Sequence, residues 1–258
     1  MQSKLKQTFK VLALLSIISC NYNSQDATRK LKKKDTLLYA IYDSDNISKS
    51  IMSFTVLADS SFIFTNIVER PNYNKTEEFK GLVKIKNNHL DFFPFELDYN
   101  KSQNAELKNN YIDFEGGEFP FRMRIEKTKI QSPNYINYSR FPDIAVFKFI
   151  EKENSEHYKN YEINNDDLYK AEDILKQCFS DNKDKLTKYS DYVKQINAVK
   201  NKQNEIILFV HCYCKLDNFI KKEFRLAPIE MHDGGTCNVY IEINLSKNKY
   251  THFHTASF

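Results

Sequence analysis

The sequence lacks the short motifs that identify many enzymes: it has no G-x-S-x-G, no H-E-x-x-H and no P-loop. It also gives no membrane span, because the apolar run Val11–Ile18 is far shorter than the ~20 residues that a helix needs to cross a bilayer. These absences leave no residue that can be named as catalytic. They also leave no cofactor to predict.

Basic charge is concentrated at the start of the chain rather than in its main part. The formal net charge is +4, but residues 1–19 contribute three lysines and no acid, and residues 20–35 carry five basic residues against two aspartates. Residues 36–258 therefore sum to −2. A protein that reads nucleic acid needs a basic face on its fold. The charge pattern thus excludes nucleic acid as a partner.

The first twenty residues have the order of parts of a secretory signal. Lys4, Lys6 and Lys10 precede the apolar run, which ends in Ser19-Cys20. The stretch Ile17-Ile18-Ser19-Cys20 resembles a bacterial lipobox. That resemblance implies cleavage between Ser19 and Cys20 and attachment of acyl chains, palmitate among them, to Cys20. Two or more acyl chains hold a protein stably to a membrane. The alternative is an ordinary cleaved signal.

Residues 20–35 form a polar segment that is predicted to be a disordered tether. Its basic run Lys30–Lys34 is interpreted either as a solvated spacer or as a patch for anionic lipid headgroups. Lipoproteins of the Bacteroidota that reach the cell surface tend to carry acids directly after the lipidated cysteine, and this chain has a single Asp26 there. The tether therefore favours the periplasmic face of the outer membrane over the cell surface.

Residues 36–130 are predicted to form an antiparallel β lobe of about eight strands. Apolar residues alternate with polar ones, as in the dry face Phe119, Phe121, Met123 and Ile125 against the wet face Arg122 and Arg124. The pairs Asn87-Asn88, Asn109-Asn110 and Gly116-Gly117 suit two-residue hairpin turns. A meander of this size closes into a small barrel or folds into a sandwich.

The phenylalanines of this lobe allow two interpretations. They fill a small core, or they line a barrel that holds one apolar ligand. The residues in question are Phe79, Phe92, Phe93, Phe95, Phe119 and Phe121.

Residues 131–142 are predicted to be a linker, and residues 143–258 an α+β lobe. After a short strand at Ile144–Ile150, Asn164 or Asn165 caps a helix whose first turn carries Asp166 and Asp167. The helix is predicted to bury an apolar stripe. Its members are Leu168, Ala171, Ile174, Leu175, Cys178 and Phe179.

Four strands are predicted after the helix. Three of them are Tyr192–Val199, Glu205–Lys215 and Cys237–Leu245, and the other, around Phe224–Met231, carries a bulge. A helix wrapped by an antiparallel sheet is the plan of cystatin-like rolls. The stretches FKGLVKIKNNHLDFFPF and DGGTCNVYIEINLS are similar to those of a group of two-lobe Bacteroidota lipoproteins. That similarity implies the layout and no activity.

The four cysteines beyond Cys20 all fall on predicted inward faces of the second lobe, in a chain whose signal sends it to an oxidising compartment. Cys212 and Cys214 are two residues apart on one strand and so are poorly placed to bond to each other. Two connectivities stay open: Cys178–Cys212 with Cys214–Cys237, or Cys178–Cys214 with Cys212–Cys237. We expect at least one disulfide, against the alternative of four buried thiols.

His252 and His254 could chelate a metal with His232, but exposed histidines on a terminal strand are the simpler interpretation, and no metal site is predicted. The sequence favours a non-catalytic envelope lipoprotein that binds a partner protein or envelope component. The alternatives are an apolar-ligand carrier that uses the first lobe and a hydrolase or peptidase inhibitor that uses the second.

Overall fold

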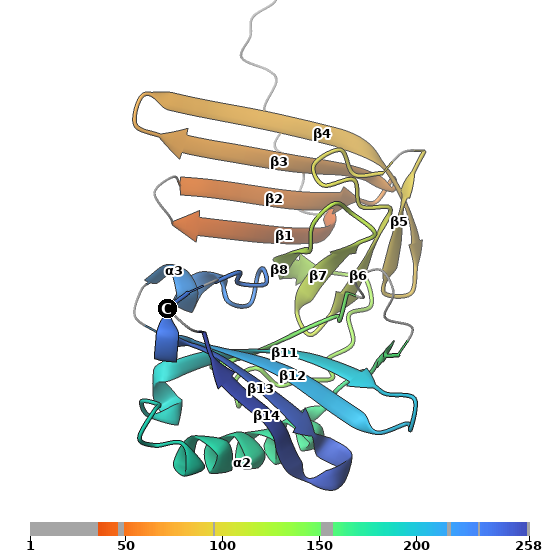
Figure 1. Cartoon of the computed structure of the whole chain (residues 1–258). Helices are drawn as coiled ribbons and strands as arrows, with labels where there is room; N and C mark the ends of the chain where they lie inside the picture. The colour runs from red at the N-terminus through yellow and green to blue at the C-terminus, as the bar shows by residue number, and fades with distance from the viewer. Residues whose placement is uncertain are drawn as a thin grey trace, which may run out of the picture. The chain divides into compact units, whose positions relative to one another are not determined.

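The computed structural model describes residues 36–45, 49–94, 96–150, 157–215, 218–231 and 233–256. Thr36–Phe258 forms one compact unit. The predicted signal, Ser19, Cys20 and the tether lie outside the described residues, as do Phe95 and His232. The compact unit is mostly β, with an eight-stranded barrel followed by a second sheet and a helix (Figure 1).

The barrel is a closed antiparallel meander, which confirms the predicted fold class. Its strands are β1 (Thr36–Asp45), β2 (Lys49–Leu57), β3 (Ser61–Arg70), β4 (Tyr73–Lys86), β5 (His89–Phe93), β6 (Asn104–Lys108), β7 (Tyr111–Glu115) and β8 (Phe121–Thr128). β8 returns to pair with β1 and closes the barrel. Asn109 and Asn110 both have positive φ, as the two-residue turn between β6 and β7 requires.

Aromatic side chains fill the barrel interior. The ring of Phe54 lies 5.4–6.1 Å from the rings of Phe62, Phe92 and Phe114, measured between centroids. Of the phenylalanines considered as a ligand lining, Phe92 and Phe121 are buried and Phe79 packs against the core. Phe93 and Phe119 point outward, at 61% and 42% exposure. This packing supports the core-filling interpretation.

The loop between β5 and β6 packs back onto the barrel. Tyr99 stacks on Phe64 with ring centroids 4.9 Å apart and also contacts Phe121. Leu97, Asn100 and Ser102 of the same loop are fully buried. Interior volume that a bound ligand would need is therefore taken by the chain's own side chains.

The second sheet has the order β10-β11-β12-β13-β14, and β9 pairs in parallel with β11. The strands are β9 (Ile144–Phe147), β10 (Lys159–Asn160), β11 (Tyr192–Lys200), β12 (Ile206–Cys214), β13 (Asn238–Asn244) and β14 (Lys249–Thr255). Three short 3-10 turns accompany them: η1 (Tyr189–Asp191), η2 (Gly235–Cys237) and η3 (Leu245–Lys247).

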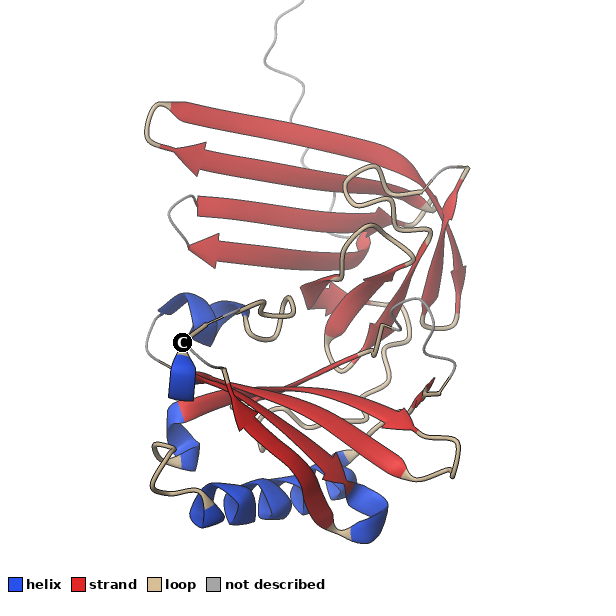
Figure 2. Cartoon of the chain, in the orientation of Figure 1, coloured by secondary structure: helices blue, strands red, loops and turns tan. Residues whose placement is uncertain are grey.

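Helix α2 (Asn165–Asp181) covers one face of this sheet (Figure 2). The side chain of Asn164 caps it by accepting from the backbone N–H groups of Asp166 and Asp167. The predicted apolar stripe is buried throughout, from Leu168 to Phe179. It packs against the inward residues of β11, β12 and β13, which include Leu208, Val210 and Ile241.

One predicted strand is wrong. The chain around Phe224 forms helix α3 (Asn218–Glu223) followed by an irregular segment, and β14 supplies the fourth antiparallel strand instead. Phe224 and Met231 nevertheless point inward, because they pack against the sheet face opposite α2. The alternation of apolar residues in this segment therefore predicts correctly that Phe224 and Met231 point inward, but it predicts the wrong backbone conformation.

The predicted disulfide is present between Cys214 and Cys237. Cys178 on α2 and Cys212 on β12 are free thiols buried in the same core. Burial raises the pKa of each thiol to about 12. Such thiols stay protonated and unreactive in the folded protein at neutral pH.

Candidate binding pocket between the barrel and the second sheet

A pocket of about 380 Å³ lies where the β7–β8 hairpin of the barrel meets the segment that begins with β9. Its volume falls within the range of pockets that bind small molecules. We call it the hairpin pocket. Apolar side chains make up most of its lining: Phe114, Phe119, Pro120, Phe121, Phe147, Phe149, Ile150 and Pro228. Two of them are strongly exposed, Phe119 at 42% and Ile150 at 61%.

The β7–β8 hairpin forms the first wall, and its turn is fixed against the loop that carries Tyr99. The backbone N–H of Glu118 donates to the carbonyl oxygen of Asn100 at 2.8 Å. At Gly117 a Cβ atom would lie 2.5 Å from that same oxygen, so only glycine allows this approach. The wall is therefore held in place by the barrel's own loop.

The second wall is the chain from Phe147 to Ile150, which is held by two amide side chains. Asn160 accepts from the backbone N–H of Phe149 and donates to its carbonyl oxygen. Asn197 on β11 donates to the carbonyl oxygens of Phe147 and Lys148. These bonds extend the order of β9 beyond its last paired residue, so that Phe149 faces the pocket on a fixed backbone.

Two ion pairs engage most of the charged groups in the lining. Arg122 on β8 makes a two-bond contact with Asp113 on β7 and lies 4.3 Å from the centroid of the Phe147 ring. Lys148 pairs with Glu115 at 2.8 Å. Burial by itself lowers the pKa of Arg122, but the Asp113 carboxylate together with Tyr138 and Tyr111 raises it overall. These charges therefore stabilise the walls, and the pocket offers mainly apolar surface to a ligand.

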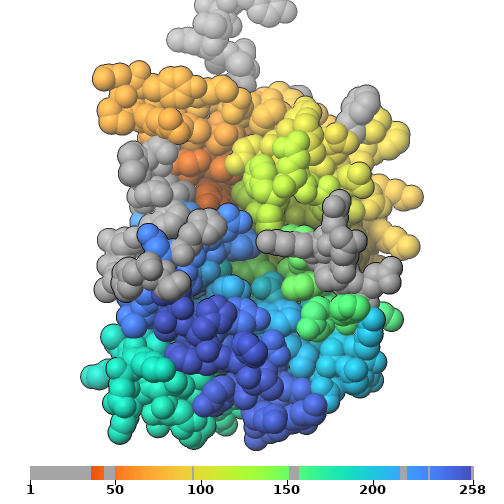
Figure 3. Space-filling view, viewed as in Figure 1, coloured from red at the N-terminus to blue at the C-terminus, as the bar shows by residue number. Residues whose placement is uncertain are grey.

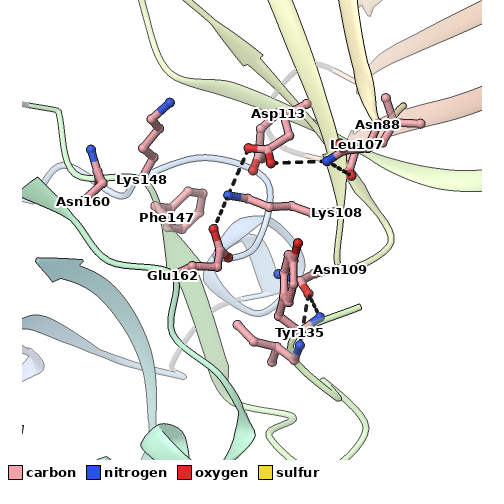
Figure 4. Close-up of polar contacts among 12 residues, drawn as sticks. Asn88, Leu107, Lys108, Asn109, Asp113, Tyr135, Phe147, Lys148, Asn160 and Glu162 are labelled. Carbon is pink, nitrogen blue, oxygen red and sulfur yellow. Dashed lines mark hydrogen bonds and ion pairs between the residues drawn. The ribbon is translucent and has the colours of Figure 1, made fainter. Parts of the chain in front are cut away.

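Polar contacts join the β6–β7 end of the barrel to the chain before β9 and before α2 (Figure 4). Lys108 at the end of β6 pairs with Glu106 and with Glu162, each at 3.1 Å. Burial acts to lower the pKa of Lys108, but the nearby carboxylates, Glu162 first, raise it overall. The side chain of Asn109 accepts from the backbone N–H groups of Tyr135 and Ile136. The predicted linker is thereby attached to the barrel.

From Phe149 a strip of aromatic rings continues across the face of the sheet opposite α2. Phe149 contacts Phe209, which contacts Tyr240, at centroid distances of 5.5 and 6.5 Å. Tyr240 contacts both His211 and His254. These rings reach a second pocket of about 370 Å³, lined by His211, Met231, Asn238, Tyr240, His254, Thr255 and Ala256. Burial, with His254 nearby, lowers the pKa of His211 and favours its neutral form.

Of the residues singled out from the sequence, Phe119 and Phe121 line the hairpin pocket, whereas the cysteines and histidines do not. The four cysteines belong to the core under α2 or to its edge. His252 and His254 do lie on a strand, β14, opposite Glu242 and Tyr240. Among the described residues no group of three or more His, Cys, Asp or Glu could hold a metal ion.

Sequence reasoning missed Arg122. It was assigned to the wet face of its strand, but the side chain is only 5% exposed. The barrel's outer surface is dry at this point because Phe147 of the second sheet covers it. The sequence does hold one signal, because Arg122 and the acidic Asp113 fall on neighbouring strands. Their pairing can be assigned only when the register of β7 and β8 is known.

No family model matches the chain, and neither a curated protein nor a solved structure matches it. In the part of the chain that the structure describes, no helix has both the length and the apolar character to cross a membrane.

Proposed function

We propose that this protein is a non-catalytic, membrane-anchored binding protein of the cell envelope, which holds an apolar segment of an envelope partner in the hairpin pocket. The observation that carries the proposal is the pocket's chemistry. Exposed Phe119 and Ile150 stand over an aromatic floor, while the ion pairs Arg122–Asp113 and Lys148–Glu115 engage the nearby charges. Large exposed apolar groups at a concave site are typical of recognition surfaces.

The anchor belongs to the same proposal. Acyl chains on Cys20 would keep the compact unit at the outer membrane, with residues 20–35 as the tether, on the periplasmic side. Replacement of Cys20 by serine tests this part. We expect the variant to lose incorporation of labelled fatty acid and to be released from the membrane fraction by raised salt, which weakens contacts made by charge alone. Continued incorporation, or membrane retention at raised salt, would overturn the anchor.

The pocket is tested by site-specific crosslinking in intact cells. A photoreactive phenylalanine analogue at Phe119 lies on the rim of the pocket, and the same analogue at Tyr73 serves as the control. Tyr73 is a similarly exposed aromatic residue, at 51%, on strand β4 of the barrel. We expect a discrete crosslinked partner from position 119 and none from position 73.

A second variant separates specific from casual contact. Ile150→Asp adds a charge to the apolar rim without touching the barrel core, so it should abolish the crosslink from position 119 while the protein stays folded. Equal crosslinking from both positions, or crosslinking that survives Ile150→Asp, contradicts the proposed role of the pocket.

The filled barrel weakens the carrier alternative in its original form. Phe54, Phe64 and Tyr99 occupy interior space, so an apolar ligand would have to displace the chain's own packing. An apolar small molecule fits the hairpin pocket better than the barrel interior.

A further inference from the structure

Two hairpin tips lie side by side at one end of the second sheet. The turn between β11 and β12 and the turn between β13 and β14 meet there, because Ile207 pairs with Asn244 across β12 and β13. Both tips appear at the lower right of Figure 1, and Figure 3 shows the β13–β14 turn in dark blue on the visible surface. No residue of either tip lines the hairpin pocket.

One carboxylate fastens the two tips together. Glu205 accepts from the side chains of Asn201 in the first tip and Asn244 at the base of the second, and it pairs with Lys247 at 2.7 Å. These bonds, Lys247 first, lower the pKa of Glu205 and keep it ionised. The backbone N–H of Ile206 also donates to the hydroxyl of Ser246. The tips therefore form one fixed surface.

That surface is basic. Lys200, Lys202, Lys247 and Lys249 belong to the two tips and are here called the tip patch. Lys202, Lys247 and Lys249 are exposed, and Lys200 is half-buried over the ring of Tyr161 at 5.2 Å. Glu205 is the one acid of residues 200–206 and 244–249, and its charge is already matched by Lys247. A net positive surface of fixed shape thus stands at this end of the molecule.

The kind of basic residue indicates the kind of partner. Elsewhere the chain uses arginine for directed contacts: Arg122 binds Asp113 through two bonds, and Arg225 donates to the carbonyl oxygens of Phe141 and Ile144. The tip patch contains only lysine, a flexible point charge that suits a diffuse anionic surface. The exposed side chains of the tips are otherwise polar, Gln203, Asn204, Ser246 and Asn248, so they present no apolar wedge to an enzyme cleft.

We propose that the tip patch contacts the anionic headgroups of a lipid bilayer and so fixes which end of the anchored protein faces the membrane. The contact needs no covalent step, because it consists of ammonium groups near phosphate groups. The contact goes beyond the proposed function. It rests on that proposal in one respect, which is that the anchor places a membrane near the protein. Each lysine near such a surface strengthens binding about fivefold.

The test measures binding of the chain from residue 20 onward, carrying Cys20→Ser so that no acyl chain is attached, to lipid vesicles. The predicted cleavage removes residues 1–19, and Thr36–Phe258 forms one compact unit. Vesicles of phosphatidylglycerol and phosphatidylcholine are compared with vesicles of phosphatidylcholine alone. The double variant Lys202→Gln/Lys249→Gln should bind the anionic vesicles about 25-fold more weakly than the parent.

The matched control is Lys84→Gln/Lys86→Gln, which removes the same charge from two exposed lysines on barrel strand β4. It should bind within about twofold of the parent, and raised salt should weaken the parent and leave little difference between the variants. Equal losses in the two double variants, or no binding to anionic vesicles, would overturn the proposal. The Phe119 crosslink is unaffected by either result, so the two proposals fail separately.

Discussion

The barrel and the second sheet use their aromatic residues in opposite ways. In the barrel, the rings of Phe54 and Phe64 face inward from neighbouring strands and are fully buried, Phe54 against Phe62 and Phe64 against Phe121. In the second sheet, α2 covers one face, while Phe209 and Tyr240 remain half-buried on the other. A sheet of this kind is stable when one face is buried in a core, so its opposite face can be available for binding.

The contrast explains where a ligand can bind. The closed barrel has no spare face, because its interior is packed and most of its outer side chains are wet. The exception is the β7–β8 hairpin, where the barrel's outer surface meets the second sheet and Arg122 is buried. The hairpin pocket lies at this contact. The pocket proposed for recognition thus lies between the barrel and the second sheet rather than inside the barrel.

The largest predicted effect compares the two kinds of ring directly. Phe54→Ala should lower the free energy of unfolding by about 3–5 kcal/mol, because it leaves a cavity among buried rings. Phe209→Ala should cost less than about 1 kcal/mol, because its ring is already half in water and leaves no enclosed cavity. Urea unfolding of both variants measures the difference. Similar losses for the two would mean that the second face is also a core.

The disulfide gives the next comparison, because residues 36–130 contain no cysteine, whereas α2, β12 and η2 carry four. Loss of the Cys214–Cys237 bond, which closes a sequence separation of 23, should cost about 3 kcal/mol. The double variant Cys214→Ser/Cys237→Ser tests this by urea unfolding.

Thiol counting checks the same assignment. With Cys20→Ser, the unreduced protein should show two reactive thiols after denaturation, from Cys178 and Cys212, and almost none while folded. Four reactive thiols in the denatured, unreduced protein would contradict the disulfide. Zero would mean that Cys178 and Cys212 are bonded as well.

Much of the fold follows from local patterns. Period-two alternation and the turn residues Asn109 and Asn110 predict the meander, and the spacing of Leu168, Ala171 and Leu175 predicts α2. Each of these signals acts over a few residues, and each matches what the structure contains. The cysteine faces follow from the same alternation, because every other residue of a strand shares a face.

The failures have a common physical origin in contacts between distant segments. The sequence pattern predicts a surface position for Arg122, but Phe147 of a distant segment covers it. The pattern around Phe224 predicts a strand, but this stretch is buried as a helix and a loop. The hairpin pocket arises from β7–β8 and the chain after β9, so no single stretch of sequence contains it. Patterns report which residues are buried but not which segment buries them.

A third prediction concerns the covered face of the second sheet, where Lys194 is 1% exposed. Burial lowers its pKa to about 8 from an ordinary value of 10.5. Its ammonium group donates to the carbonyl oxygen of Tyr189 at 2.9 Å and lies 3.5 Å from that residue's ring centroid. Folding therefore costs free energy whenever this lysine must stay charged.

The sign follows from proton counting. Above pH 8 the folded state releases the Lys194 proton, while the unfolded state keeps it up to about pH 10.5, so stability rises with pH in this window. The gain between pH 7 and pH 9.5 should be about 2 kcal/mol larger for the native protein than for Lys194→Met. Urea unfolding at both pH values measures it. Parallel pH profiles for the two proteins would show that Lys194 titrates normally.

The smallest predicted effect concerns how α2 is held over the covered face. The Asn164 side chain accepts from two backbone N–H groups, and Asp167 returns a bond to the backbone of Asn164. Asn164→Ala removes this cap and should cost about 1 kcal/mol. Lys170→Ala, an exposed position on the same helix, is the control and should change stability by less than about 0.5 kcal/mol. If Asn164→Ala is also neutral, the helix is held by its apolar stripe alone, and the covered face owes its order to packing in the same way as the barrel interior.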